Sequence, residues 1–592
     1  MRLPTDSGDK VVEEIKRDIS LEIDLLASNT HKRHRSNLSK AEREGLKRIL
    51  HEINHGDLRV VLADKGGALC IVPQSFIKQL ESDKLSDTAS FENLGPNEPI
   101  TNAQTNLLDL WRKGEDASFV TRVESKEVVG LCEKKDGKPQ RLSTASDFKP
   151  RTPYFYGLLK IHKLAPESLK PGVKIPIRLV TNLSKSVTSR SDKFINWRFL
   201  QPLQNEFCKD LAKDSTDVLQ WLENVHPINP PSGFSWDFVS LYDNLTPSLV
   251  MEALSQAIDE LRPDWSPEMV DWLLELVRLS LDSSFAKYGE NWYKSKIGIP
   301  TGGALSVTLA NIAVFYVLRK VVYGTDFELA PSELLGVKRF VDDLGGLWTG
   351  SRDQFISWSN DVNIRLQEFG LSIKEDNLDP WDFNTPGEFT TLLDIKFQFN
   401  QAEGLVTDVN IKETDSRAFL HFTSSHPRQT FPSIVYSQAL RFRRIIKDNT
   451  LLNRRLCELG ECFYRSGYPK KMVDGIMKDV SGRPRTLNYR KKETGAPYPV
   501  VWVQTFGPAT DAISKVVKQA NKVIKQSEVW KDVVRPIGIV NRRGRNLGDI
   551  VLKQKHFALQ NDMSKVTGTS RCTPKVAQGK RKKDDVLVSL AT

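Results

Sequence analysis

The sequence predicts an α+β protein of several domains, and three observations lead to this class. At 592 residues the chain is longer than a single hydrophobic core supports. Two short apolar runs interrupted by acidic residues, 234–242 and 338–348, are typical of strands. Helices are indicated by the apolar run 304–318, which is too short to span a bilayer comfortably and should be buried, and by the periodic segment 437–479.

The composition points to a globular protein with a polyanionic partner. Lys and Arg number 85 against 74 Asp and Glu, which gives a net charge of +11. The six cysteines include no Cys-x-x-Cys pair, so neither a zinc ribbon nor a disulfide framework is indicated, and free thiols in a reducing compartment are expected. The charged start of the chain lacks the pattern of a secretory signal peptide. We therefore expect an intracellular protein with no membrane partner.

Taken in order, the chain begins with a polar, helix-prone extension over residues 1–55. Ser39 and Glu42 have the spacing of a capping box, which predicts a helix running through Leu50. The basic patch at 31–35 is interpreted as part of a solvated helical lead-in rather than as a dedicated binding arm.

The next unit, 56–233, begins with an expected hairpin over 59–71. At its tip Lys65 lies between Asp64 and a pair of glycines, and glycine lets a phosphate approach the backbone closely. A plain hairpin turn is the alternative interpretation. Further along, 154–163 interleaves aromatic residues with Lys160, a combination that suits a nucleic-acid groove.

The segments 234–242 and 338–348 carry three carboxylates, Asp237, Asp342 and Asp343. Adjacent carboxylates repel each other, so a fold that brings them together usually holds cations between them. Paired divalent cations of this kind carry out phosphoryl transfer by clamping the attacking and leaving oxygens. An isolated Asp-Asp pair is most often a solvated turn, and only its sequence context favours a catalytic site.

That context resembles a known family. The runs Asp237-Phe-Val-Ser-Leu-Tyr242, Gly298-Ile-Pro-Thr-Gly-Gly-Ala-Leu-Ser306 and Phe340-Val-Asp-Asp343 resemble, in order and at plausible spacing, motifs A, B and C of reverse transcriptases. More narrowly, the chain is similar to Penelope-like retroelements in Ala63-Asp-Lys-Gly-Gly67, Phe155-Tyr-Gly-Leu-Leu-Lys-Ile-His-Lys163 and Leu420-His-Phe-Thr-Ser-Ser-His-Pro427. The similarity extends, with gaps, over about 37–552.

The resemblance implies a right-hand polymerase. After the helical extension it places the fingers and the start of an antiparallel palm at 56–233, the rest of the palm at 234–412 and a basic helical thumb at 413–480. A linker and connector follow at 481–560, and a basic tail at 561–592. The expected reaction is RNA-directed DNA synthesis, in which a primer 3′-hydroxyl attacks a deoxynucleoside triphosphate. The implied partners are an RNA template, a DNA primer and dNTP.

The resemblance also assigns the site residues. Asp237 and Asp342 would bridge two Mg²⁺ ions, or Mn²⁺, with help from Asp343 and the carbonyl of Phe238. Tyr242 would crowd the sugar 2′ position and reject ribonucleotides, although an ordinary buried tyrosine is the alternative. The expected nucleotide-binding residues are Lys65, Lys160, Arg178, Tyr242, Gly302, Gly303 and Lys374. The expected nucleic-acid-binding residues of the thumb are Arg441, Arg443, Arg444, Lys447, Arg454 and Arg455, for which a solvated charged face is the default interpretation.

Two departures from the family pattern stand out. Thr301 and Ala304 occupy positions where many relatives carry Met and Pro, which leaves fine substrate selection open. No GIY-YIG endonuclease signature follows the connector, and a basic run at 579–583 has the composition of a nuclear address or of a solubilising end. The remaining alternatives for the function are an RNA-templated RNA polymerase and a decayed or domesticated nucleic-acid-binding derivative.

Overall fold

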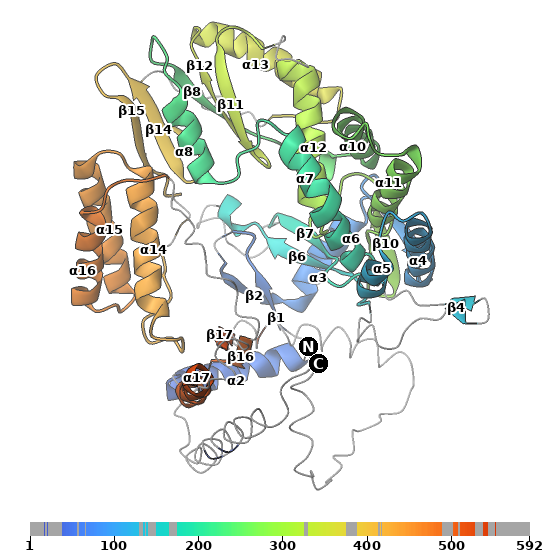
Figure 1. The fold of residues 1–592 in the computed structure, drawn as a ribbon, viewed down its shortest axis with the longest axis horizontal. Coiled ribbons are helices and arrows are strands. Elements are labelled where there is room, and N and C mark those ends of the chain that lie inside the picture. The colour runs from blue at the N-terminus through green and yellow to red at the C-terminus, as the bar shows by residue number, and fades with distance from the viewer. Residues whose placement is uncertain are drawn as a thin grey trace.

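The computed structural model describes residues 38–55, 58–65, 67–129, 150–164, 175–324, 330–373, 387–412, 415, 417–487, 501–506, 510–526, 537–542 and 551, with short pieces at 17, 21, 134–135 and 138–139. Its many helices and mainly antiparallel sheets confirm the predicted α+β class. Figure 1 shows strands in the middle of the molecule, with helical groups on opposite sides of them.

The sheet that carries the acidic residues has three antiparallel strands. Their order is β11 (Leu334–Phe340), β12 (Asp343–Trp348) and β8 (Ser232–Asp237). Both strands predicted from the sequence are therefore present. The register sets Asp343 at the start of β12 opposite Asp237 at the end of β8. Only two residues, Val341 and Asp342, connect β11 to β12, so the predicted turn is tight.

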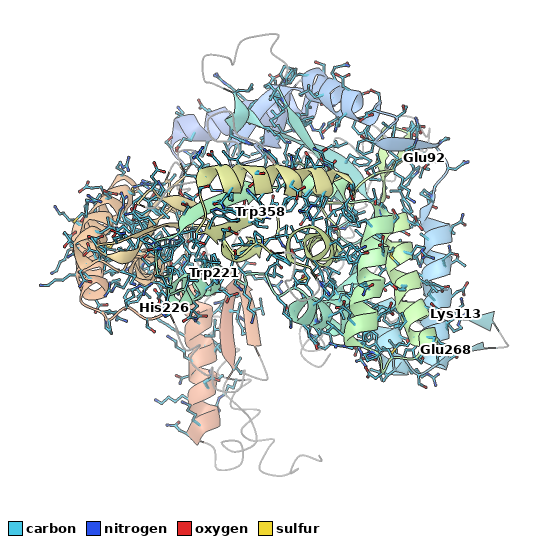
Figure 2. The ribbon with its side chains drawn as sticks, turned by 90° about the horizontal axis from the view of Figure 1, so that it is seen from above. Glu92, Lys113, Trp221, His226, Glu268 and Trp358 are labelled. Carbon is cyan, nitrogen blue, oxygen red and sulfur yellow. The ribbon has the colours of Figure 1, made fainter. Side chains whose placement is uncertain are left out.

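Aromatic side chains cover one face of this sheet and hold it in place. Phe234 and Trp236 of β8 and Trp348 of β12 pack against α13 (Arg352–Gln367). Trp358 of α13, labelled in Figure 2, stacks on Trp348 with 5.1 Å between the ring centroids. Large buried rings of this kind contribute strongly to core stability, so the acid-bearing strands rest on a rigid support.

The apolar run predicted to be a buried helix forms α12 (Ser306–Leu318), which continues as the π-helix η4 (Arg319–Tyr323). Its length and hydropathy would also suit a membrane span, but 83% of this stretch is buried inside the protein. It packs against α7 (Gln201–Phe207) and α10 (Pro247–Leu261). The prediction of a core helix is confirmed.

The N-terminal part of the described chain follows the sequence signals closely. Helix α2 (Lys40–His55) begins with the predicted capping box, in which the Ser39 and Glu42 side chains accept hydrogen bonds from each other's backbone N–H groups. The expected hairpin follows as β1 (Leu58–Leu62) and β2 (Leu69–Pro73). Helix α3 (Gln74–Leu85) packs on both strands.

A five-stranded sheet combines strands that are far apart in sequence. Its order is β3 (Phe91–Gly95), β10 (Asn291–Ser295), β9 (Phe285–Tyr288), β6 (Tyr154–Leu159) and β7 (Ile177–Asn182). Strands β9 and β10 come from the stretch that the sequence assigned to the unit 234–412, yet they complete a sheet of the preceding unit. This sheet therefore contains strands from both sides of the domain boundary expected at residue 233.

Helices fill the space around these two sheets. In Figure 1, α4 and α11 lie together at the side of the molecule away from α14–α16, whose bounds are given below. Trp272 of α11 donates a hydrogen bond to the Leu110 carbonyl of α4 and so fastens this pair. The helices here are α4 (Ile100–Asp116), α5 (Arg122–Val129), α6 (Ser189–Ile195), η3 (Asn196–Leu200), α8 (Ser215–Asn224), α11 (Pro267–Asp282) and the short η1 (Ile161–Lys163) and α9 (Leu241–Asn244). The strands β4 (Lys134–Lys135) and β5 (Lys138–Pro139) form a separate two-stranded sheet.

Beyond α13 the chain adds a second antiparallel sheet and a helical unit. The sheet comprises β13 (Thr390–Leu392), β14 (Ile395–Asn400) and β15 (Gly404–Val409). The helical unit comprises α14 (Thr430–Ile445), α15 (Asn449–Arg465) and α16 (Lys470–Ser481), as the periodicity of 437–479 predicted. Further on, β16 (Val501–Thr505) and β17 (Gly538–Arg542) pair in parallel on either side of α17 (Thr510–Gln526) in the sequence.

The core contains one acidic residue whose protonation should set a pH dependence of stability. Asp192 of α6 is buried, and burial raises its pKa from 3.8 to about 7, partly offset by hydrogen bonds from Thr188 and Ser280. The folded protein therefore binds this proton more tightly than the unfolded chain. The stability that the protonated Asp192 contributes is present at acid pH and is lost as pH rises toward 7.

We expect Asp192→Asn to remove this dependence, because an amide is uncharged at every pH. At pH 8 the variant should be more stable than the wild type by up to a few kcal/mol, on the order of the energy that such a pKa difference represents. Near pH 4 the two proteins should have similar stability. Chemical denaturation at both pH values measures this, and equal differences at pH 4 and pH 8 would contradict it.

Candidate active site

The three predicted carboxylates lie at one end of the three-stranded sheet. Asp237 ends β8 directly opposite Asp343, and the backbone N–H of Phe238 donates to the Asp342 carbonyl at 3.3 Å. The side chains of Asp237 and Asp342 are exposed, whereas Asp343 is partly buried. The fold thus brings Asp237 to an adjacent pair of acids that lies more than a hundred positions further along the sequence.

The three carboxylates at this end of the sheet repel one another. Burial and the negative charges of Asp342 and Asp237 raise the pKa of Asp343 above 3.8, while Lys412 and Lys65 lower it. Within the described residues no three Asp, Glu, His or Cys side chains converge closely enough to hold a metal ion as they stand. The chemistry of the group still fits a hard divalent cation, since a cation would relieve the repulsion that the shifted pKa reflects and would find oxygen ligands.

The cationic side chains near the acids include one that was predicted and one that was missed. Lys65, at the tip of the β1–β2 hairpin, lies close enough to act on Asp343, while its expected contact with a nucleotide stays a prediction. Lys412 was not predicted, because it follows β15 in a segment with no motif of its own. Only the pairing of the strands in space reveals its position.

Tyr242 belongs to α9 and lies next to the three acids. It is partly buried, and burial together with the charge of Asp342 raises the pKa of its phenol. Its carbonyl accepts a hydrogen bond from the Ile299 N–H at 2.8 Å, so the glycine-rich loop is fastened to this segment. Gly298 has a φ of +84°, and a Cβ there would lie 2.5 Å from the Tyr242 carbonyl oxygen. This position therefore requires glycine.

Gly302 and Gly303 of the glycine-rich loop both lie close to other atoms of the protein. We predicted that they allow the backbone to approach a base pair. In the structure a Cβ on Gly302 would lie 2.2 Å from the Thr181 carbonyl oxygen of β7, and one on Gly303 would lie 2.6 Å from the Ser306 hydroxyl. Gly302 therefore seats the loop against β7, whereas Gly303 allows a close contact with the start of α12. Their expected approach to a base pair stays a prediction.

Arg178 projects from β7 beside the hairpin. Its guanidinium is half exposed, and its Nη1 lies 3.2 Å from Oδ1 of Asp64, whose side chain is fully buried. Neither Asp64 oxygen accepts a hydrogen bond from the described part of the chain. The ion pair with Arg178 therefore offsets the cost of burying the Asp64 carboxylate. Asp64 was not predicted as a site residue, although it directly precedes Lys65.

Two other predicted nucleotide contacts have less structural support. Lys160 is partly buried at the end of β6, where its N–H donates to the Pro176 carbonyl at 2.8 Å and so ties β6 to the strand of Arg178. Lys374 lies outside the described residues.

Four of the predicted thumb arginines make contacts within the protein, and one of them, Arg443, is buried, while their contact with nucleic acid stays a prediction. Each makes a contact that joins α14 or α15 to the neighbouring sheet, to α8 or to the segment after α16. Lys447 and Arg454 are exposed and remain predictions. The internal contacts are Arg441 with Asp394, Arg443 with the Arg483 carbonyl, Arg444 with the Thr216 hydroxyl, and Arg455 with Asp408 and Glu458.

Comparisons with known proteins give a partial match. A family model described as an animal helix-turn-helix domain matches residues 418–478, which contain α14, α15 and most of α16. No protein with a curated description matches the chain.

Among solved structures, the chain is similar to apo telomerase from Candida tropicalis truncated from its C-terminal domain, with 12% identity and a TM-score of 0.38 over 58% of this chain and 63% of that one, less than two thirds of its length. It is also similar to telomerase from Candida albicans in complex with a fragment of telomeric RNA, with 12% identity and a TM-score of 0.40 over 85% and 78% of the two chains. A third similarity is to an insertion-loop deletion mutant of the RNA-dependent RNA polymerase of a human picobirnavirus, with 10% identity and a TM-score of 0.39 over 79% and 88%. These likenesses are loose, and the function proposed below rests on the site itself.

Proposed function

We propose that this chain is a nucleic-acid polymerase of the reverse-transcriptase kind, an RNA-directed DNA polymerase from a Penelope-like retroelement. The observation that carries the proposal is the pairing of Asp237 with Asp343 at the sheet end, with Asp342 in the adjoining turn. Such a cluster of carboxylates suits phosphoryl transfer, in which an enzyme acts by positioning and by neutralising charge.

In this proposal a primer 3′-hydroxyl attacks the α-phosphorus of a dNTP, and pyrophosphate leaves. Asp237, Asp342 and Asp343, with the Phe238 carbonyl, would hold two Mg²⁺ ions, or Mn²⁺. When bound, these ions supply charge neutralisation and activation of the attacking hydroxyl. The carboxylates contribute orientation, since β8 and β12 fix their backbones on the aromatic support.

The triphosphate would be held from the side of the hairpin. Lys65 and Arg178 present two cations there, and Arg178 keeps half of its surface exposed while Asp64 anchors its other side. A guanidinium anchored on one face can grip phosphate oxygens with the other, at a smaller cost in conformational entropy than a free side chain. Lys160 would support the same surface from β6.

The net charge of +11 suits a template–primer hybrid, which is a polyanion. Since most thumb arginines are engaged internally, the exposed Lys447 and Arg454 are the candidates for duplex contact on the helical unit. In line with the composition, we place the activity inside the cell, and the basic run 579–583 suits a nuclear location.

The test is primer extension by the purified protein with Mg²⁺. An RNA template with a DNA primer should be extended with dNTP and much less with NTP. Extension with NTP alone would identify an RNA-templated RNA polymerase instead. Duplex binding without extension under any combination would identify a decayed binding derivative, and either outcome would overturn the proposal.

The position of Tyr242 leads to a prediction about sugar selection. Its ring lies beside Asp342, so a 2′-hydroxyl on a nucleotide bound at the carboxylates should meet it. We expect Tyr242→Ala to lower the preference for dNTP over NTP by roughly tenfold or more, with a smaller loss in dNTP incorporation, because selection of this kind depends on steric rejection. Tyr242→Phe keeps the ring and should keep the preference. Single-nucleotide incorporation kinetics measure both, and unchanged selection in Tyr242→Ala would make this residue part of the core only.

A further inference from the structure

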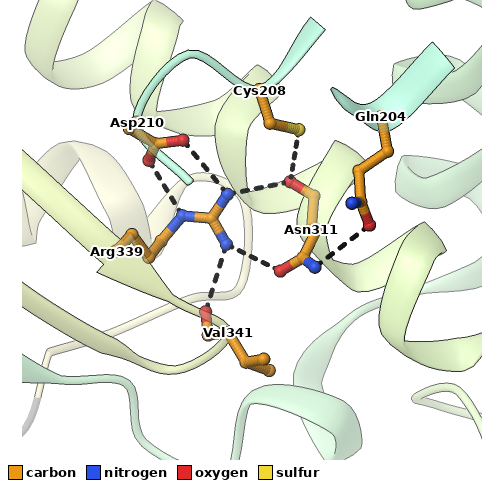
Figure 3. Close-up of polar contacts among 6 residues, drawn as sticks. All are labelled: Gln204, Cys208, Asp210, Asn311, Arg339 and Val341. Carbon is orange, nitrogen blue, oxygen red and sulfur yellow. Dashed lines mark hydrogen bonds and ion pairs between the residues drawn. The ribbon is translucent and has the colours of Figure 1, made fainter. Parts of the chain in front are cut away.

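A buried arginine lies behind the carboxylates, one residue before the exposed end of β11. The Arg339 side chain is 0% exposed. Figure 3 shows its guanidinium surrounded by acceptor atoms of three residues, Asp210, Asn311 and Val341. Such an arrangement is costly unless every donor is satisfied, so a fully paired buried arginine indicates a specific role.

The guanidinium binds two side chains as a fork. Its Nε donates to Oδ2 of Asp210 at 2.9 Å and its Nη2 donates to Oδ1 at 3.3 Å. On the other side, Nη1 donates to Oδ1 of Asn311 at 3.0 Å and Nη2 to the Asn311 carbonyl at 3.1 Å. The backbone is fixed as well, because the Arg339 N–H donates to the Asp210 carbonyl at 2.9 Å.

The fifth hydrogen bond of the guanidinium reaches the turn between β11 and β12, which carries Asp342. Nη1 also donates to the Val341 carbonyl at 3.1 Å. Val341 has a φ of +58°, a left-handed conformation that a β-branched residue rarely adopts. The surrounding structure must hold such a residue in place, and the bond from Arg339 grips the peptide that joins Val341 to Asp342.

The hydrogen bonds of Arg339 also connect this turn to α12, the helix that follows the glycine-rich loop. Asn311 lies in α12, and its Nδ2 donates to Gln204 Oε1 of α7 at 3.1 Å. The Cys208 thiol lies 3.4 Å from the Asn311 carbonyl, and burial raises its pKa to about 12, so it stays protonated and can donate. Because Asn311 is fixed from both sides, Arg339 is held in one position relative to α12.

We propose that Arg339 is a positioning residue for the carboxylates, acting through the Val341 carbonyl to hold the turn that aims Asp342 and Asp343. This inference rests on the function proposed above. Lysine cannot replace arginine here, because an ammonium is a point donor and lacks the planar fork that reaches Asp210, Asn311 and Val341 together.

The test compares two variants with a matched control. Arg339→Lys keeps the charge and loses the fork. The double variant Arg339→Gln with Asp210→Asn leaves no charge in this buried group of residues, so it should fold even if Arg339→Lys does not. The control is Arg319→Lys in η4, where the arginine also pairs with a carboxylate but through one nitrogen, with Nη1 at 2.9 and 2.7 Å from the two oxygens of Glu260.

Three measurements are made on each protein. For both Arg339 variants we expect kcat for extension to fall about a hundredfold, with KM for dNTP within roughly threefold, because displaced catalytic groups affect the transition state more than substrate binding. We expect the affinity for Mn²⁺, measured by electron paramagnetic resonance, to fall about tenfold, since it depends on where the carboxylates point. Amide exchange at 341–343 should become faster. Arg319→Lys should match the wild type in all three, with at most a lower melting temperature.

The outcomes separate this inference from the function on which it rests. Variants that fold and keep the wild-type kcat, Mn²⁺ affinity and amide exchange would show that Arg339 serves stability only, and the inference would be wrong. A wild type that binds Mn²⁺ but extends no primer would overturn the proposed function, while Mn²⁺ affinity and amide exchange would still decide the role of Arg339.

Discussion

Asp342→Asn is expected to abolish primer extension, by at least about a thousandfold, while the affinity for a primer–template duplex stays within roughly threefold of the wild type. Asparagine has almost the same shape as aspartate but lacks its charge, so the loss falls on the transition state. Asp342 is exposed in its turn, and the replacement removes no buried partner. The melting temperature of the metal-free protein should stay the same or rise, because one of the charges that oppose Asp343 is gone.

The matched control is Asp264→Asn, an equally exposed aspartate between α10 and α11, which should leave extension and duplex binding unchanged. Single-turnover extension and fluorescence anisotropy with a labelled duplex give the two quantities. Extension by Asp342→Asn near the wild-type rate would mean that the turn between β11 and β12 is not the active site.

Gly302→Ala should produce the second largest effect. A Cβ at this position would lie 2.2 Å from the Thr181 carbonyl oxygen, and backbone atoms cannot move aside as a flexible side chain can. The loop must therefore shift away from β7, which also carries Arg178. We expect extension to fall about a hundredfold, as misplacement on this scale can cause, and stability to fall by ~1–3 kcal/mol, as for an overpacked core.

Gly45→Ala provides the comparison, because no atom lies within 4 Å of a Cβ built at this position of α2. Alanine there should stabilise the helix by up to about 1 kcal/mol and leave extension unchanged. Denaturation curves and extension rates for both variants test the prediction. A Gly302→Ala protein as active and as stable as the wild type would show that the loop does not depend on its contact with β7.

The sequence predicted the features whose cause is local. Strand and turn chemistry around Asp237, Asp342 and Asp343 follows from a few neighbouring residues, and so does the capping box at Ser39. The buried helix α12 was recognisable because it is apolar on every face. These predictions needed no knowledge of what the segments pack against, and the structure confirms the elements themselves.

The sequence could not predict features that depend on partners far along the chain. Arginine in a basic helix indicates nucleic-acid contact just as well as it indicates an internal ion pair, and only the packing of α14 and α15 shows that Arg443 is buried. The roles of Asp64 and Arg339 are equally hidden, since their partners Arg178 and Asp210 are more than a hundred positions away. The need for glycine at position 302 is hidden in the same way, because the atom that a Cβ there would meet belongs to β7.

The five-stranded sheet has a consequence for how the protein is made. Its edge strand β3 pairs only with β10 among the described strands, and β10 lies about two hundred residues further on. At synthesis rates of about 5–20 residues per second, β3 has no sheet partner for about 10–40 s after it leaves the ribosome. A strand whose backbone N–H and C=O groups lack a partner can pair with another chain during such a delay. Fragments that end before Ser295 should therefore be poorly soluble, whereas the shortest N-terminal fragment able to complete this sheet must include β9 and β10.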